Sequence, residues 1–123
     1  MSTPTQQKAI FLHAKQGEFA VGTRDVPKPG PGDILVKNVA AGINPVEWKI
    51  QAFGLFVEKY PAILGLDAAG LVETVGEGVT TFKKGDRVLY PGFLDNDRAT
   101  YQEYTLTAAD FAAKVSLKYR RRR

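Results

Sequence analysis

Short stretches that alternate between apolar and polar residues recur along the chain, separated by glycine and proline. Such stretches predict half-buried strands. Six of them can be recognised: Lys8–Ala14, Glu18–Val26, Asp33–Gly42, Leu66–Thr74, Arg87–Tyr90 and Thr100–Leu106. The KPGPGD sequence at residues 28–33 suits neither helix nor strand. The pattern therefore predicts a mainly β domain, built as a small barrel or sandwich.

One segment, NPVEWKIQAFG, has a helical pattern instead. Its apolar residues follow one another at steps of four, three and four: Val46, Ile50, Phe53 and Val57. Asn44 is a suitable N-cap, Pro45 fits the first helical position, and Glu47 completes a capping-box spacing. We expect a short helix that ends at Gly54, with Val57 just beyond it.

Composition narrows the class of protein. The chain has 123 residues, of which 44% are hydrophobic and 24% charged, and this suits one globular domain. No run approaches the roughly 18 apolar residues of a membrane span, and the N-terminus does not read as a secretory signal. We therefore expect a cytoplasmic protein with no membrane partner.

The net charge of +4 comes from one end of the chain. Five of the 17 basic residues lie in the final KYRRRR, so the rest has 12 basic against 13 acidic residues. A nucleic-acid-binding domain spreads its basic residues over a folded surface, so nucleic acid is not an expected partner. We expect residues 1–7 to be flexible, residues 8–115 to form the domain, and residues 116–123 to be a disordered basic tail. The tail is either a nuclear-import or polyanion-binding tag or the meaningless end of an interrupted coding sequence.

Several kinds of site are excluded by residue types. The chain has no cysteine and a single histidine, His13, too few for a zinc site or a plausible Ser–His–Asp arrangement. The glycine pairs at residues 30–32 and 76–78 lack the third glycine and the strand-to-helix setting of a dinucleotide-binding turn. Residue types and spacing alone therefore lead no further than a small, β-rich domain.

Three longer segments carry a family resemblance: KPGPGDILVKNVAAGINPVEWKI, YPAILGLDAAGLVETVGEGVTTFKKGDRV and ATYQEYTL. They closely resemble the N-terminal, GroES-like domain of the medium-chain dehydrogenase/reductase superfamily, from Lys8 to Val115. The resemblance implies a partly open β-barrel with one or two short helices.

Two positions distinguish the chain from the zinc alcohol dehydrogenases of that superfamily. Asn44 stands where those enzymes have a cysteine, and Gly65-Leu66-Asp67 stands where they have Gly-His-Glu. The chain resembles instead the zinc-independent branch, the quinone reductases and the fungal trans-acting enoyl reductases, so no zinc is expected. The NPVEWK stretch points to that branch.

The resemblance also suggests candidate site residues, each with a structural alternative. Asn44 is a helix cap or a contact on the nicotinamide side of the cofactor and with substrate. Lys49 is a solvated surface residue or a substrate contact and proton donor, which would stabilise an enolate-like charge. Asp67 is a structural hydrogen-bond acceptor near the cleft floor or a pocket residue. Trp48 and Phe53 are core residues or walls of the substrate pocket.

The activity implied by the resemblance is the NADPH-dependent reduction of an activated C=C bond in an enoyl thioester or a quinone-like acceptor. The Rossmann domain that holds most of the cofactor would follow this segment, and we expect the chain to be truncated before it. NADPH would then not bind tightly, and the chain alone would be inactive. The alternative is a non-catalytic interaction module or a truncated gene product, with strand edges exposed for self-association.

Overall fold

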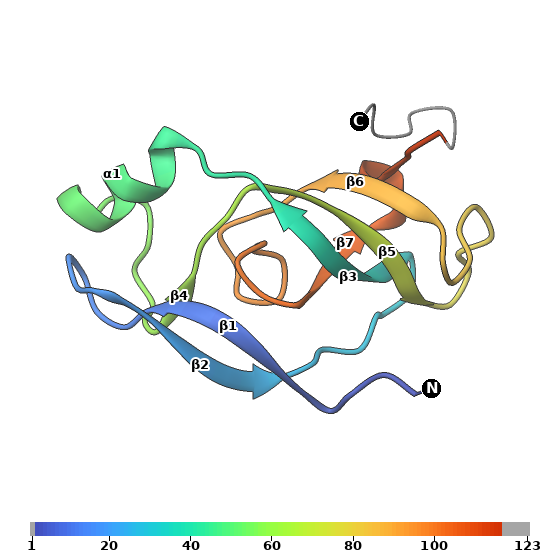
Figure 1. The fold of residues 1–123 in the computed structure, drawn as a ribbon, viewed down its shortest axis with the longest axis horizontal. Coiled ribbons are helices and arrows are strands. Elements are labelled where there is room, and N and C mark those ends of the chain that lie inside the picture. The colour runs from blue at the N-terminus through green and yellow to red at the C-terminus, as the bar shows by residue number, and fades with distance from the viewer. Residues whose placement is uncertain (1, 117–123) are drawn as a thin grey trace, which may run out of the picture.

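The computed structural model describes residues 2–116, so the basic tail expected at residues 116–123 lies, apart from residue 116, outside the described residues. Two antiparallel sheets face one another, with one helix at their edge (Figure 1). The first sheet has the strand order β2-β1-β4, and the second has the order β7-β3-β5-β6-β8. The elements are β1 (Gln6–Leu12), β2 (Phe19–Asp25), β3 (Asp33–Ala41), α1 (Pro45–Phe53), β4 (Ala62–Ile63), β5 (Asp67–Val75), β6 (Arg87–Pro91), β7 (Tyr104–Ala108), the 3-10 helix η1 (Ala109–Phe111) and β8 (Ala113–Lys114).

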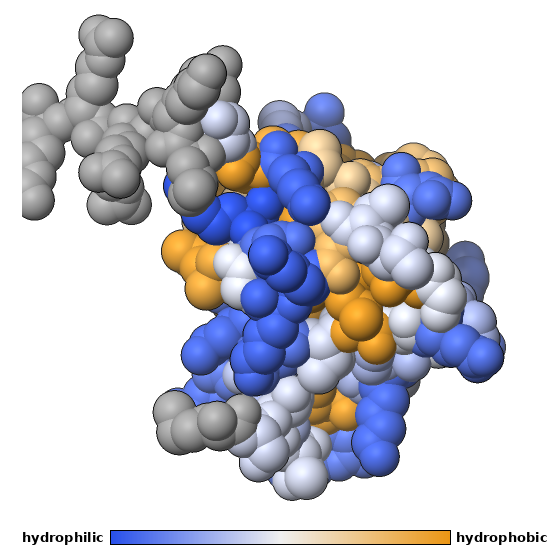
Figure 2. Space-filling view, turned by 90° about the vertical axis from the view of Figure 1, so that its right-hand side faces the viewer, coloured by the Kyte–Doolittle hydropathy of each residue, from blue (hydrophilic) through white to orange (hydrophobic). Residues whose placement is uncertain are grey.

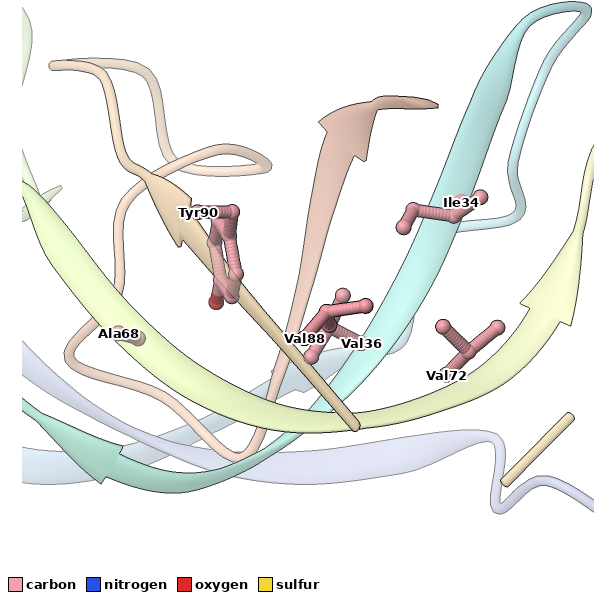
Figure 3. Packing of buried hydrophobic residues seen from close by; sticks show 6 residues of the cluster. All are labelled: Ile34, Val36, Ala68, Val72, Val88 and Tyr90. Carbon is pink, nitrogen blue, oxygen red and sulfur yellow. The ribbon is translucent and has the colours of Figure 1, made fainter. Parts of the chain in front are cut away.

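The second sheet contains the larger part of the core. Alternate residues of β3, β5 and β6 point to the same side and form one buried cluster, shown in Figure 3: Ile34, Val36, Ala68, Val72, Val88 and Tyr90. This is the period-two arrangement that strands impose, and it confirms the mainly β expectation. The curvature of the sheet has a local cause. The β3–β5 register shifts between Asn38 and Ala40, opposite the small Ala69 and Gly70.

The helix packs against the first sheet. Ile50 of α1 is fully buried with Leu12 and Leu64, and Val57 joins them from just beyond the helix. The helix ends at Gly54, which has the left-handed φ of 65° that favours glycine. The expectation for one member of the apolar stripe was wrong. Phe53 is 58% exposed, because the last turn of the helix projects beyond the sheet.

The segment from residue 95 to residue 103 also differs from expectation, because the last long strand begins only at Tyr104 and not at Thr100. Side-chain hydrogen bonds hold the preceding residues in a compact loop. Asn96 donates to the carbonyl of Pro61 and accepts from the backbone N–H of Ile63. These contacts join distant parts of the sequence, so no local sequence pattern predicts them.

The same loop joins the two sheets. The amide of Ile10 in β1 donates to the carbonyl of Tyr101, and the amide of Asn38 in β3 donates to that of Glu103. An isolated bridge pairs Ala9 with Gln102. The sheets are therefore linked through a short connecting segment rather than a continuous ladder, which confirms the partly open barrel.

Strand β2 is one of the edge strands of the described part of the chain, and large apolar side chains are exposed on it and elsewhere on the surface. Strand β2 pairs only with β1 among the described strands, and its Val21 is 70% exposed. Self-association through this edge stays a prediction. The end of the molecule away from α1 shows apolar residues in small groups between hydrophilic ones (Figure 2). Within residues 2–116, no helix is long and apolar enough to cross a membrane.

A pair of glycine substitutions tests the packing of the curved sheet. A Cβ at Gly70 would lie 2.1 Å from the carbonyl oxygen of Lys37, whereas a Cβ at Gly30 would meet nothing within 4 Å. We expect Gly70→Ala to lower the free energy of unfolding by about 3 kcal/mol, and Gly30→Ala to leave it nearly unchanged. Urea unfolding followed by circular dichroism measures both. Equal stability of the two variants would contradict the tight β3–β5 approach.

Candidate functional site

A groove of about 800 Å³ lies between the two sheets, beside the start of α1. Its walls come from β1 and β2, from the end of β3, and from residues 100–103 of the connecting loop. Most of the lining is apolar and includes large side chains that the core leaves exposed: Ile10, Val21, Val39, Ile43 and Trp48. A concave, mainly apolar surface with a few polar groups is the usual form of a small-molecule site.

The first turn of α1 forms one side of the groove. Asn44 and Glu47 form the expected capping box, in which the carboxylate of Glu47 accepts from the backbone N–H of Asn44 at 2.9 Å. Glu47 is only 3% exposed, and its second oxygen, Oε1, has no hydrogen-bond partner within the described part of the chain. The helix cap therefore accounts for the hydrogen bonding of Oε2 but provides no partner for Oε1.

Asp67 lies beside the same helix start. Its Oδ2 accepts from the side-chain amide of Asn44 at 3.0 Å, and its backbone carbonyl accepts from the N–H of Gly42. A Cβ at Gly42 would lie 1.9 Å from Asp67 Oδ1, so the carboxylate occupies the space that this glycine leaves. Asp67 is thus a hydrogen-bond acceptor, as expected. The Asp67 side chain is exposed, and the side-chain amide of Asn44 is the partner of its Oδ2.

Tyr101 is held firmly in the groove wall. Its ring packs against buried residues of two core clusters, and its backbone N–H donates to the carbonyl of Leu64 at 3.0 Å. Gly65 has a φ of 109°, and a Cβ there would lie 2.7 Å from the Tyr101 ring. Burial raises the pKa of Tyr101 to about 12, with further contributions from the carboxylates of Glu47 and Asp67. The phenol therefore keeps its proton at any physiological pH.

Two further polar side chains of the lining, Asn38 and Gln102, are hydrogen-bonded to the protein itself. The side-chain amide of Asn38 donates to the carbonyl of Gln102 at 2.8 Å, and its oxygen accepts from the hydroxyl of Tyr90. The amide of Gln102 donates to the carbonyls of Asn96 and Ala99. These two side-chain amides therefore have no N–H group directed toward a ligand, and they serve to hold the groove in shape.

The other candidates, Trp48, Lys49 and Phe53, all belong to α1. Trp48 lines the groove and is 54% exposed. Lys49 and Phe53 are not among the lining residues, and both lie near the Trp48 ring. The Lys49 Nζ lies 5.7 Å from the centroid of that ring, and the Phe53 ring centroid lies 6.1 Å from it. The roles suggested for Asn44, Lys49 and Phe53 in a substrate site stay predictions.

Sequence reasoning missed the importance of Tyr101 and of the free oxygen of Glu47. Tyr101 was one tyrosine among several, and the Glu47 pattern was fully accounted for by a helix cap. No local signal identifies either, because the groove forms only when the loop at residues 96–103 folds between the sheets.

The side chains around Asn44 do not fit a zinc site. The three positions that correspond to ligand or neighbouring positions in zinc enzymes hold an amide, a leucine and an exposed carboxylate, and the amide is bound to that carboxylate. Among residues 2–116, no group of three or more His, Cys, Asp or Glu side chains is placed to hold a metal ion. The side chains of Asn44 and Asp67 at the helix start are therefore engaged with one another.

The family model that describes the alcohol dehydrogenase GroES-like domain matches residues 30–116. The chain belongs to this family. A dehydrogenase of Emericella nidulans, orsE, is 45% identical and is matched over 86% of this chain and 32% of its own length. The trans-enoyl reductase tndF of Aspergillus flavipes is 36% identical, with 85% and 32% covered.

A solved structure shows the same fold. The quinone oxidoreductase of Pseudomonas syringae is 28% identical, with a TM-score of 0.82 over 93% of this chain and 35% of that one. These findings confirm the resemblance to a GroES-like domain with enoyl reductases and quinone oxidoreductases among its relatives. The chain spans about a third of the length of the curated relatives it matches.

Exchanging the two partners at the helix start tests the Asn44–Asp67 contact. The side-chain amide of Asn44 lies 3.0 Å from the Asp67 carboxylate, and Asn44→Asp replaces it by a second carboxylate. Because aspartate is also a good helix cap, the main effect is the repulsion between the two carboxylates. We expect the free energy of unfolding to fall by about 1 kcal/mol at pH 7. The double variant Asn44→Asp/Asp67→Asn restores an amide–carboxylate pair and should recover most of the loss. Urea unfolding of both variants, of Asp67→Asn and of the unmodified chain measures this. Additive effects of the two changes would contradict a direct contact.

The raised pKa of Tyr101 predicts a dependence of stability on alkaline pH. A tyrosine whose pKa is about 12 when folded and about 10 when unfolded stabilises the fold below pH 10. That contribution is lost as the pH rises from 10 to 12. We expect the urea midpoint of Tyr101→Phe to fall less steeply than that of the unmodified chain across this window. Parallel curves for the two proteins would contradict the burial of the phenol beside the Glu47 carboxylate.

Proposed function

We propose that this chain is the substrate-binding domain of an NADPH-dependent oxidoreductase that reduces an activated C=C bond, in an enoyl thioester or a quinone-like acceptor. The observation that carries the proposal is the groove. It is large enough for a small organic molecule, mainly apolar, and formed by a GroES-like domain whose relatives include a trans-enoyl reductase and a quinone oxidoreductase.

The residues of the chain would bind and orient the acceptor. The exposed apolar walls, with Val39 and Ile43 on one side and Val21 on the other, would cover the substrate and exclude water. Bound NADPH would supply the hydride. Lys49 is the candidate to stabilise the developing oxyanion or to return a proton, because its ammonium group lies near the Trp48 ring at the edge of the groove.

This function needs a cofactor-binding part that the sequence does not supply. Residues 1–123 contain no G-x-G-x-x-G turn between a strand and a helix, the feature that grips a dinucleotide pyrophosphate. Without it, the cofactor is not held against the substrate, and the rate gain from proximity is lost. We therefore propose that this chain alone binds an acceptor but turns it over negligibly.

A second candidate is a non-catalytic interaction module. The observation that favours it is the free edge of β2, where Val21 is 70% exposed and no other described strand pairs. An unpaired edge can accept an extended segment of a partner or of a second copy.

A chimeric enzyme tests the proposed function. Residues 8–115 would replace the corresponding part of the Emericella nidulans dehydrogenase, and NADPH oxidation would be followed with a crotonyl thioester and with a quinone. We expect turnover with one of these acceptors, and a loss of at least about tenfold in kcat for Lys49→Met if the ammonium acts in the reaction. Lys59→Met, at an exposed lysine of the following loop, is the matched control.

Two results would count against the proposal. A folded chimera that reduces neither acceptor would contradict the assignment of the groove as a substrate site. An unchanged kcat in Lys49→Met would remove this lysine from the mechanism and leave the groove itself in place.

A further inference from the structure

The outer side of β2 has no backbone partner within the described part of the chain. Strand β2 lies at an edge of the ribbon in Figure 1 and pairs with β1 alone. Among the described residues, the backbone hydrogen bonds of Phe19–Asp25 are those of this one ladder. Every second residue of the strand therefore directs its N–H and C=O groups away from β1. Such a row of groups can pair with another extended strand.

The other edges of the two sheets are short or already covered. Strands β4 and β8 have two residues each. On the outer side of β7, the N–H of Tyr104 donates to the side chain of Gln7 at 2.8 Å. The N–H of Leu106 on the same side donates to the carbonyl of Asp97 at 2.8 Å. Among the described strands, β2 is therefore the long edge that remains open.

Strand β2 also has few of the features that protect a free edge. Natural edge strands are usually short, contain lysine or proline, or are interrupted by a bulge. The seven residues of β2, FAVGTRD, include neither lysine nor proline, and their register with β1 has no shift. The two charged residues, Arg24 and Asp25, lie at one end, and Arg24 is paired with Asp97. Val21 is 70% exposed, so the middle of the edge is apolar and accessible.

The sequence of this edge is complementary to itself in one antiparallel register. In a symmetric pair of strands, the residue on the two-fold axis faces its own copy. With Val21 on the axis, the two valines face each other. Phe19 then faces Thr23 of the second copy, and by the same count Glu18 faces Arg24. Apolar, aromatic–β-branched and opposite-charge pairs of this kind stabilise neighbouring strands.

The two neighbouring registers are less favourable. With Gly22 on the axis, Phe19 would face Asp25 of the second copy. With Ala20 on the axis, the pairing would extend into residues 16 and 17, where the N–H of Gly17 is bound to Ala14 in a turn. Charge complementarity and the extent of the strand therefore both favour the register with Val21 on the axis.

We propose that two copies of this chain associate through β2, in antiparallel orientation, with Val21 on the two-fold axis. The first sheet then continues from one copy into the other, in the order β4-β1-β2-β2-β1-β4. Directly opposed residues lie on the same face of an antiparallel sheet. Because Phe19 and Val21 line the groove, its wall then extends onto the second copy. The inference concerns assembly and does not rest on the proposed activity.

Sedimentation velocity of the 123-residue chain over a range of concentrations measures this association. We expect an equilibrium between monomer and dimer. Val21→Lys places two like charges opposite each other on the axis and should raise the dissociation constant at least about tenfold. Leu89→Lys is the matched control, because Leu89 is 52% exposed on β6 of the second sheet. It should leave the dissociation constant unchanged. Circular dichroism verifies that both variants are folded.

Single cysteines test the register, since the chain has no cysteine of its own. In Val21→Cys the two thiols face each other across the axis, within reach of a disulfide. Thr23→Cys changes another exposed residue of β2, but its two thiols would lie four residues, or about 13 Å, apart along the joined strands. Mild oxidation should therefore link Val21→Cys into dimers at least about tenfold faster than Thr23→Cys.

Four results would overturn the proposal. The first is a chain that remains monomeric at about 1 mM, the weak limit of specific binding. The second is a dimer whose dissociation constant is unchanged in Val21→Lys, and the third is equal linking of the two cysteine variants. The fourth is a monomeric chain that binds an added extended peptide, which would assign the edge to another partner. None of these results bears on the proposed activity, which the turnover of the chimera tests.

Discussion

Backbone hydrogen bonding by residues 100–103 holds the two sheets in their relative position. Tyr101 accepts from β1, Glu103 accepts from β3, and Glu103 also donates back to β1 through Lys8. Backbone donors and acceptors buried between sheets must be satisfied, so this segment fixes both the distance and the orientation of the sheets. The groove lies beside that connection, and its polar lining residues come from the connecting segment, α1, β1 and β3.

The start of α1 is the second fixed point. Glu47 binds the amide of Asn44, Asn44 binds Asp67, and Asp67 lies over Gly42 at the end of β3. One helical turn is thereby attached to the ends of β3 and β5. The same cap that stabilises the helix therefore also places the buried Glu47 carboxylate in the lining of the groove.

The elements with local signals could be predicted from the sequence. Alternating strands β1, β2, β3, β5 and β6 were expected nearly at their bounds, and so was α1 with its cap and its terminal glycine. The two-residue strands β4 and β8 are too short to produce a pattern. Strand β7 begins later than expected because the residues before it form a loop. That loop is held by the hydrogen bond from the backbone N–H of Ile63 in β4 to the side chain of Asn96. Asn44, Trp48 and Asp67 could be named from motifs, but the groove and Tyr101's place in it depend on contacts between distant segments.

The large apolar side chains of the groove wall are separate from the core. Val21, Val39 and Ile43 belong to none of the buried clusters and are 70%, 74% and 86% exposed. Their substitution removes few packing contacts, so it should cost little stability. These three positions can therefore change during evolution without compensating changes elsewhere, and a library confined to them would retain a high proportion of folded members.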